Sequence, residues 1–472
     1  MEKFFKLKEN NTSIKTEVIA GITTFIAMAY IIFVNTNILA GAGMNEQRLL
    51  GDAVGKAGLN AFNDSVIGAV FVATIISAII GTLIMGLVAN VPFAQAAGMG
   101  MNAFFTYYVV LTCGLSWEAA LAVVFICGLI NIFITITKIR VAIINAIPES
   151  LKNAIGAGIG LFIAIIGFNG AGLIVSDLAT LIAIGNIKSP TTLLAIFGLI
   201  VTVILMVRRV KGAILLGIIL TTIVGVIAQL GFNANLNIII PENFSIFSAP
   251  PSLAPTLFKL DFGALFSAKV GLFTVIAIII SFSLVDTFDT IGTFIGTGAN
   301  TGVFDEKNDK PGKGIFPRKL DKALFADATA TSIGALMGTS NVTTYVESAA
   351  GISEGGSTGL TSVVTSICFF LALFISPLVG IVPTQATAPA LIIVGLLMIS
   401  SITRIDFQNL EDGIPAFFTI SMMPFSYSIA NGIAAGFIFY VIVKVFKGKA
   451  KEVHPIMYIF AVLFTLKFII GV

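Results

Sequence analysis

Residues 341–353 read NVTTYVESAAGIS, and residues 90–100 read NVPFAQAAGMG. Each stretch begins with residues that favour extended backbone, Pro92 in the second and the β-branched Val342 and Thr343 in the first. Each then reaches Ala-Ala-Gly, where a helix can start, so neither is a good full-length membrane helix. We expect two half-helices whose positive N-terminal ends face one shared site. Two re-entrant loops with structural glycines are the alternative.

The two stretches belong to an internal repeat with a spacing of about 250 residues. TFIA from Thr24 matches TVIA from Thr274. VNT from Val34 matches VDT from Val285, and the glycine-rich IGTLIMG that ends the second apolar run matches IGALMG that ends the ninth. Four matches in one register indicate duplication. Each copy holds an odd number of spans, so the second must enter the membrane upside down, which is the inverted-repeat plan of secondary transporters.

Composition also indicates an all-α, polytopic membrane protein. Of 472 residues, 57% are hydrophobic and 11% charged, whereas a soluble domain carries about 25% charged residues. Apolar runs of about 20 residues, enough to cross a bilayer, recur along the chain. We place spans near residues 17–40, 64–89, 92–111, 117–137, 150–170, 192–207, 212–231, 268–292, 322–338, 343–355, 359–380 and 387–402. A hairpin over 413–446 and an extra crossing or interfacial helix over 455–471 complete the chain.

Lysine and arginine set the expected orientation. They cluster before the first span, after the fourth and sixth, and between the eighth and ninth. Positive-inside counting places all these segments, and so the N-terminus, on the cytoplasmic side of the plasma membrane. The residues are Lys3, Lys6, Lys8, Lys15, Lys138, Arg140, Arg208, Arg209, Lys211, Lys307, Lys310, Lys313, Arg318, Lys319 and Lys322, joined by Lys444, Lys447, Lys449 and Lys451 if 413–446 is a hairpin.

Three observations exclude other classes of function. The net charge of +3 is too small for a nucleic-acid partner. Cys113, Cys127 and Cys368 lie in apolar segments without disulfide or metal spacing. His454 is the single histidine, and one histidine cannot supply a typical zinc site. We therefore expect no cofactor, no metal ion and no enzymatic activity.

The eighth span carries a polar stripe. It reads SFSLVDTFDTIGTFIGTG over residues 281–298 and places Asp286, Asp289 and Thr293 on one helical face, together with further serine and threonine residues. A stripe with two carboxylates must face a cavity or a partner helix. The second acidic element is Glu347, at the start of the second half-helix.

The first half-helix offers Gln95 and Asn102 in the corresponding place. A desolvated carboxyl group can exchange a proton, and an ionised one accepts N–H hydrogen bonds. The alternative role of Asp286 is structural, a hydrogen bond to the end of a neighbouring helix. Asp327 is expected to be a structural residue nearer the cytoplasmic edge. No basic residue is expected deep within the site, which argues against an anionic substrate. The aromatic residues that are candidates for stacking on a planar ring are Tyr30, Phe93, Phe104, Phe288 and Tyr345; packing is the alternative role of each and, because phenylalanine is so common here, the more frequent one.

At these motifs the sequence resembles the nucleobase–cation symporter family with the uracil-permease fold, and within it the AzgA-like adenine, guanine and hypoxanthine permeases. The features that carry the resemblance are TTFIAMAYIIFVN in the first span, AAGMGMNAFF in the third, FDTIGT in the eighth and TTYVESAAGISEGGSTGLT in the tenth. MMPFSYSIANGIAAGF and KGKAKEVHP extend it toward the C-terminus, so it covers nearly the whole chain.

The resemblance implies about fourteen membrane segments in a seven-plus-seven inverted repeat, with short strands leading the half-helices of segments 3 and 10. A core domain would carry substrate against a gate domain, and the protein would form a homodimer. The first repeat would cover 1–231 and the second 266–472, joined by 232–265, with the core at about 16–140 and 266–380 and the gate at about 145–231 and 385–472.

The family's functional residues fall, by the matching motifs, on Asp289, Thr293, Glu347 and Asn102. The resemblance implies symport of a purine base with a proton, in which these four side chains bind the ring with Phe93 and Phe288 beside it. The proton would be carried by Asp289, Glu347 or Asp286. Since Asp286 lies three residues before Asp289, the main acidic ligand of the eighth segment stays open between them.

Other functions remain as competitors. The same architecture serves carriers of xanthine, uracil or an anion, and sodium is the alternative coupling ion. An intramembrane aspartyl protease needs two aspartates on facing helices, whereas Asp286 and Asp289 share one helix. A passive channel would not concentrate its substrate. The preferred purine stays open.

Overall fold

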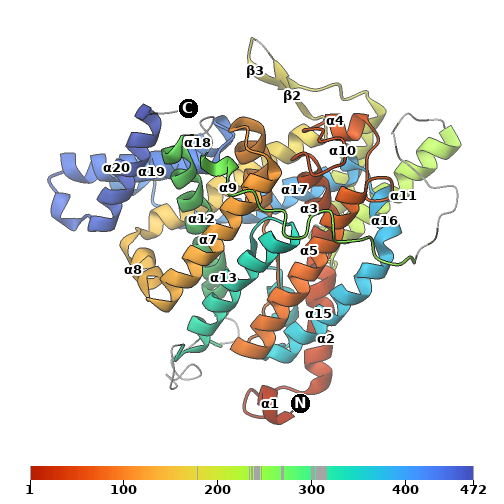
Figure 1. The fold of residues 1–472 in the computed structure, drawn as a ribbon, viewed down its shortest axis with the longest axis horizontal. Coiled ribbons are helices and arrows are strands. Elements are labelled where there is room, and N and C mark those ends of the chain that lie inside the picture. The colour runs from red at the N-terminus through yellow and green to blue at the C-terminus, as the bar shows by residue number, and fades with distance from the viewer. Residues whose placement is uncertain are drawn as a thin grey trace.

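The computed structural model describes residues 2–177, 179–232, 247–266, 271–298 and 316–470, together with residues 234, 236, 238, 245, 303 and 304. The chain is mostly helical, with its N-terminus and C-terminus at opposite ends of the molecule (Figure 1). Ten helical segments among the described residues are long and apolar enough to cross a membrane. Outside the described residues lie Lys307, Lys310, Lys313 and most of 233–246, the first part of the expected connection over 232–265.

The helices follow the apolar runs closely. In the first half they are α1 Glu2–Phe5, α2 Ile14–Met28, α3 Ile31–Ala40, α4 Ala53–Lys56, α5 Ser65–Ile84, α6 Met99–Ala103, α7 Trp117–Ile136, α8 Ile139–Ala146, α9 Glu149–Gly170, α10 Pro190–Val207 and α11 Ala213–Phe232. In the second half they are α12 Leu272–Gly298, α13 Lys319–Met337, α14 Ser348–Ser353, α15 Gly359–Ala372, α16 Ser376–Ile381, α17 Thr384–Ile399, α18 Leu410–Phe425, α19 Ile429–Phe446 and α20 Pro455–Ile470. The expected hairpin over 413–446 is confirmed, because α18 packs along α19.

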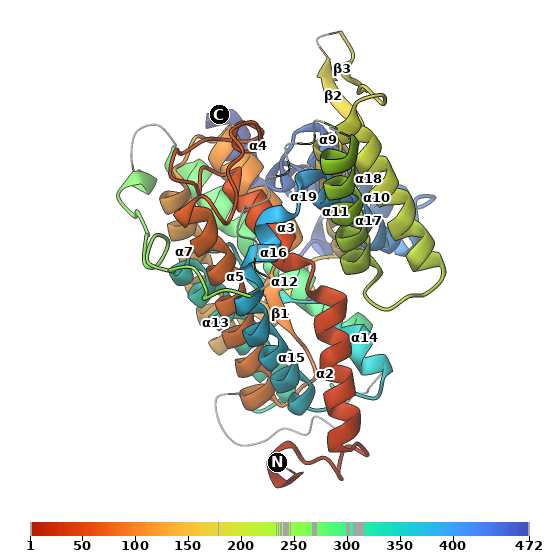
Figure 2. The ribbon, with the colours of Figure 1, turned by 90° about the vertical axis from the view of Figure 1, so that its right-hand side faces the viewer.

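The helices form two groups (Figure 2). In one, α13 packs against α7 and α5, and α15 packs against α2 and α5. In the other, α9 packs against α17 and α18, and α10 packs against α11. Small residues allow the closest approach in the second group. A Cβ on Gly160 of α9 would lie 2.7 Å from the carbonyl oxygen of Gly395 in α17, so this crossing requires glycine.

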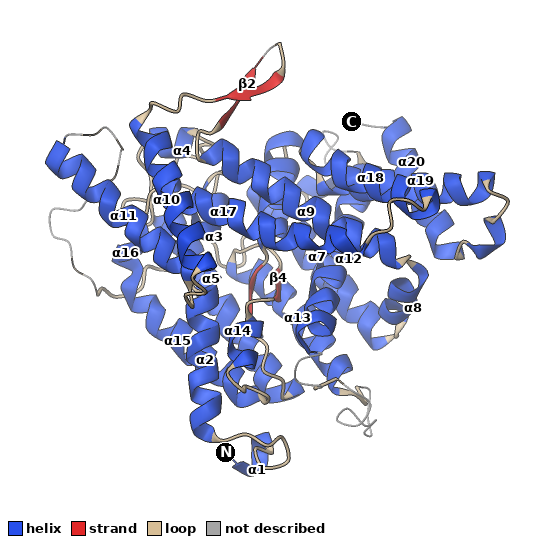
Figure 3. Cartoon of the chain, turned by 180° about the vertical axis from the view of Figure 1, so that it is seen from behind, coloured by secondary structure: helices blue, strands red, loops and turns tan. Residues whose placement is uncertain are grey.

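Residues 90–100 and 341–353, which lie far apart in the sequence, meet at the centre of the molecule. Strand β1 Gln95–Ala97 pairs antiparallel with strand β4 Val342–Thr344, and Gln95 lies opposite Thr344 (Figure 3). Every residue of both strands is buried. Each strand leads into a short helix, α6 after β1 and α14 after β4. Non-helical backbone at this depth is therefore enclosed by protein, as a membrane requires.

A second pair of strands lies at the periphery. Strands β2 Ile174–Asp177 and β3 Leu181–Ile184 form an exposed hairpin between α9 and α10, at the opposite end of the molecule from α1 (Figure 1).

Two helices continue as π-helices. Helix α6 continues as a π-helix over Phe104–Thr112, and α5 ends in another over Met85–Ala89. π-Helical turns occur mostly at functional sites, and the first of these follows directly on Asn102.

Candidate functional site

Glu347 lies at the point where β4 ends and α14 begins. Its half-buried side chain accepts a hydrogen bond from the hydroxyl group of Tyr30, which lies at the break between α2 and α3. The close contact of α14 with α2 makes this possible. A Cβ on Gly351 of α14 would overlap the Ala20 carbonyl of α2, so the helices approach this closely only with glycine there.

Asp289 shares this neighbourhood. It is half-buried on α12 and forms no hydrogen bond or ion pair within the part of the chain that the structure describes. Its carboxylate interacts electrostatically with Glu347 and with the phenol groups of Tyr30 and Tyr345. The structure thus brings together the two acidic residues that the sequence predicted, and it leaves one of them without a protein partner.

A hollow of about 270 Å³ opens beside Glu347. Its other walls are Ala27 of α2, the end of α10 at Met206, and the segment from Arg209 to Ile214 that begins α11. Gly212 has a φ of +69° and brings this connecting segment against Ile26. The hollow therefore lies between α2 of one helix group and the α10–α11 connection of the other, with Glu347 in its wall.

The other predicted site residues are more scattered. Asn102 is buried on α6, and its side-chain oxygen accepts a hydrogen bond from Ser340 while its amide nitrogen has no partner. Thr293 and Phe288 are buried on α12. Phe93 is fully buried and packs against Phe294 and Phe304. Within the part of the chain that the structure describes, no hydrogen bond, ion pair or ring contact joins these residues to Asp289 or Glu347, so their part in a shared site stays a prediction.

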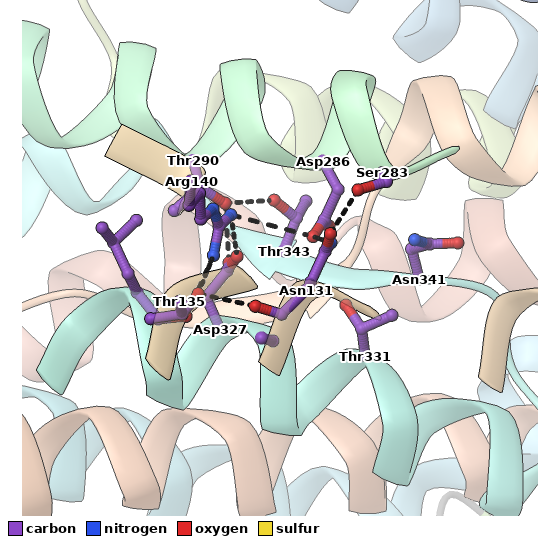
Figure 4. Close-up of polar contacts among 12 residues, drawn as sticks. Asn131, Thr135, Arg140, Ser283, Asp286, Thr290, Asp327, Thr331, Asn341 and Thr343 are labelled. Carbon is purple, nitrogen blue, oxygen red and sulfur yellow. Dashed lines mark hydrogen bonds and ion pairs between the residues drawn. The ribbon is translucent and has the colours of Figure 1, made fainter. Parts of the chain in front are cut away.

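Asp286 faces a different environment from Asp289. It belongs to a buried charge cluster with Arg140 of α8 and Asp327 of α13, each at most 1% exposed (Figure 4). Arg140 Nη2 lies 3.2 Å from Asp327 and 4.0 Å from Asp286. Arg140 is one of the basic residues counted for the expected orientation, yet its guanidinium group is buried, because α8 packs back against α7. The expectation of no deep basic residue is wrong for the same reason.

Asp327 is the better satisfied of the two acids. It lies midway along α13, fully buried, rather than at the cytoplasmic edge. Its Oδ1 accepts hydrogen bonds from Thr290 Oγ1 at 2.7 Å and Thr344 Oγ1 at 3.1 Å, with Gln95 Nε2 at 3.4 Å. Both strands of the central pair are therefore tied to this carboxylate.

Asp286 has fewer partners. Asn131 of α7 donates to its Oδ2 at 2.7 Å, and Asn131 in turn accepts a hydrogen bond from Ser283. Among the described residues, the other oxygen of Asp286 is buried without a hydrogen-bond partner, and so is Nε of Arg140. The predicted structural hydrogen bond of Asp286 thus exists, but its partner lies in the middle of α7 and not at a helix end.

Sequence reasoning missed Arg140, Asn131 and the position of Asp327. One signal was present: the run IRVAII from Ile139 is apolar on both sides of its arginine, which is unusual for an exposed loop. For metal ions, no group of three or more histidine, cysteine, aspartate or glutamate side chains forms a ligand set in the described ranges.

Comparison with known proteins agrees with these features. A family model described as the permease family matches residues 15–435. The chain is 46% identical to the guanine/hypoxanthine permease PbuG of Bacillus subtilis, over 99% of both chains. It is 41% identical to the adenine permease AdeP of Escherichia coli, over 99% of this chain and 96% of that one. A putative permease of Methanocaldococcus jannaschii is 48% identical over 99% of this chain and 98% of that one.

Solved structures support the fold. The transmembrane domain of the cyanobacterial bicarbonate transporter BicA aligns with a TM-score of 0.59 at 15% identity, covering 89% of this chain and 96% of that one. The murine anion transporter Slc26a9 in its inward-facing state aligns with a TM-score of 0.58 at 11% identity, over 92% and 69% of the two chains. At such identities the likeness concerns the transporter fold alone.

Proposed function

The chain belongs to the nucleobase permease family, so it is a multi-pass membrane transporter and not an enzyme, and from that premise we propose that it imports purine bases together with protons. Three relatives that match along nearly their whole length are named as guanine/hypoxanthine or adenine permeases, which supports a purine over xanthine or uracil. Its membrane would be the plasma membrane, with the N-terminus in the cytoplasm.

The observation that carries this proposal is the pair of Asp289 and Glu347. Both carboxylates are half-buried and interact electrostatically, yet Asp289 has no protein partner among the described residues. A purine ring presents N–H donors, and an ionised carboxylate is a strong acceptor for them. Purine N–H groups would therefore supply the partners that Asp289 lacks, while Tyr30 holds Glu347 in place.

The remaining predicted ligands would complete the site. The free amide nitrogen of Asn102 can donate to a ring nitrogen or to the oxygen at position 6 of guanine or hypoxanthine. Thr293 lies one turn beyond Asp289 on the same face of α12. Phe288 and Phe93 would border the ring. An anionic substrate fits poorly, because two acidic side chains face this site.

Transport would follow from motion between the two helix groups. The group of α2, α3, α5, α7, α12, α13, α14 and α15 carries Asp289 and Glu347, and the group of α9, α10, α11, α17, α18 and α19 would act as the gate. The hollow of about 270 Å³ between them supports an inward-open access route. Elevator-like movement within a seven-plus-seven inverted repeat would alternate that access. At least one carboxyl group among Asp286, Asp289 and Glu347 would carry the proton, and the protein would act as a dimer.

Uptake measurements test the proposal. Labelled hypoxanthine, guanine and adenine are supplied to cells that lack their own purine carriers, with and without a protonophore. We expect concentrative uptake that collapses with the proton gradient. Asp289→Asn and Glu347→Gln are compared at matched surface expression, and each is expected to abolish uptake. No uptake of any purine by well-expressed protein, or unchanged uptake in both variants, would contradict the assignment.

A further inference from the structure

The buried cluster around Arg140 contains more acidic than basic groups. The Arg140 guanidinium lies within 4.0 Å of both carboxylates, those of Asp286 and Asp327, and each of the three side chains is at most 1% exposed. With both acids ionised, the cluster would carry a surplus negative charge in a dry interior, which is strongly unfavourable. Two acids that compete for one cation bind one proton between them.

The hydrogen bonds show which acid holds that proton. Asp327 lies nearer to Arg140 and accepts from three neutral donors, so it is suited to the ionised form. Asp286 lies farther away. Within the described ranges it accepts from Asn131 alone and keeps one buried oxygen without a partner. An unpaired oxygen costs least on a neutral carboxyl group.

We propose that Asp286, Asp327 and Arg140 form the proton-binding site of the transporter, with the proton carried on Asp286, while Asp289 and Glu347 serve the substrate. This inference rests on the proposed function and divides its acidic residues between two tasks. The cluster can also respond to deprotonation. The free Nε of Arg140 and the free oxygen of Asp286 are complementary, so the guanidinium can turn toward Asp286 once it becomes charged.

The proton site is coupled to the substrate site by contact and by charge. Thr344 and Gln95 reach Asp327 from the strands that lead to the two half-helices, and Glu347 follows β4 directly. Asp289 interacts electrostatically with Asp286 and Asp327. The remaining titratable group that faces the cluster is Cys127 of α7, which interacts with all three charged residues. Loss of the proton from Asp286 would thus place a new negative charge near Asp289.

The same geometry selects a proton over a sodium ion. A sodium ion would bring a second cation beside Arg140, whereas a proton neutralises the surplus charge without one. Proton binding also needs no cage of oxygen ligands. Coupling at this site is therefore expected to depend on pH and to be indifferent to sodium.

Purified full-length protein in liposomes tests the division. Two activities are measured: exchange of labelled hypoxanthine across the membrane without a gradient, and accumulation driven by an imposed proton gradient. In Asp286→Asn, the neutral amide imitates the protonated acid. We expect exchange within about twofold of wild type, accumulation reduced to equilibration, and no proton uptake reported by a pH-sensitive dye. Replacing external sodium with potassium is expected to leave wild-type accumulation unchanged.

Asp327→Asn gives an independent test. With one acid left beside Arg140 the cluster is neutral without a proton, so this variant is also expected to exchange without accumulating. Stabilisation against heat by added hypoxanthine identifies which variants fold and bind. Gradient-driven accumulation that persists at the wild-type level in either folded variant would overturn the inference. If wild-type protein neither exchanges nor accumulates purines, the proposed function itself fails instead.

Discussion

Helix α12 presents two aspartates one turn apart, and the two lie in opposite surroundings. Asp286 is fully buried between α7, α8 and α13, beside Arg140 and Asn131. Asp289 is half-buried near Tyr30 and Glu347 and has no hydrogen-bond partner within the described residues. Identical side chains on one polar stripe therefore differ in surroundings because different helices cover them.

The comparison separates two requirements of a coupled carrier. A substrate ligand has to be accessible and unsatisfied, as Asp289 is, so that the substrate supplies the missing donors. A proton-binding site has to be buried from water and close to electrical balance, so that binding one proton changes its net charge to zero. The cluster of Asp286, Asp327 and Arg140 has both properties. The predictions below test whether these two neighbourhoods are energetically distinct.

The largest effect is expected from Arg140→Gln. It leaves Asp286 and Asp327 buried without their cation, which costs about 3–5 kcal/mol when one partner of a buried ion pair is removed. Thermal unfolding of the purified protein in detergent measures the loss of stability. Lys138→Gln is the matched control, because Lys138 is exposed only two residues away and should change stability by no more than about 0.5 kcal/mol. Equal effects of the two substitutions would mean that Arg140 is not an essential part of a buried cluster.

Purine affinity should separate the two aspartates of α12. Asp289→Asn removes a charged acceptor from the substrate, and a hydrogen bond to a charged group contributes about 1.5–3 kcal/mol, so affinity should fall about 10- to 100-fold. Asp286→Asn should leave affinity within about threefold, because the proposal assigns Asp286 to proton binding and not to the substrate. Equilibrium binding of labelled hypoxanthine to purified protein at constant pH measures both. A larger loss in Asp286→Asn would exchange the roles of the two residues.

Much of the fold could be predicted from the sequence. Apolar runs predicted helices within a few residues of their observed ends, such as 150–170 for α9 at Glu149–Gly170 and 117–137 for α7 at Trp117–Ile136. The period of apolar residues and the bilayer thickness fix such spans locally. The repeat also brought attention to Glu347 together with Asp289, because matching segments of an inverted repeat converge.

The charge cluster could not be predicted in the same way. Arg140 follows the fourth span, where basic residues ordinarily mark the cytoplasmic side, and only tertiary packing shows that α8 turns its arginine inward. Asp327 lies on α13, whose neighbours are set by packing between distant segments. Burial of a charge depends on which helices cover it, and periodicity within one helix does not contain that information.

A smaller effect is expected from Tyr30, whose hydroxyl group donates a hydrogen bond to Glu347. Tyr30→Phe removes the hydroxyl group that donates to this carboxylate and leaves the ring, so the loss should be about 1.5 kcal/mol, or about tenfold in hypoxanthine affinity. Tyr345→Phe is the control, because its hydroxyl group donates to the Ala97 carbonyl and not to an acid. It should lower thermal stability without a tenfold loss of affinity. The opposite pattern would place the substrate nearer to Tyr345.

The smallest effect is expected at the ion pair of Lys211 and Glu354, which joins the two helix groups close to the hollow. The side chains are 60% and 29% exposed, and exposed pairs contribute about 0–1 kcal/mol, so Glu354→Gln should change the uptake rate by about twofold. High salt should abolish the difference by screening. Glu149→Gln, which breaks a pair within α9, controls for loss of an acidic residue and should leave uptake unchanged. If Glu354→Gln lowered the uptake rate as much as Asp289→Asn, the acidic residue most important for uptake would lie at the contact between the helix groups and not in the substrate site.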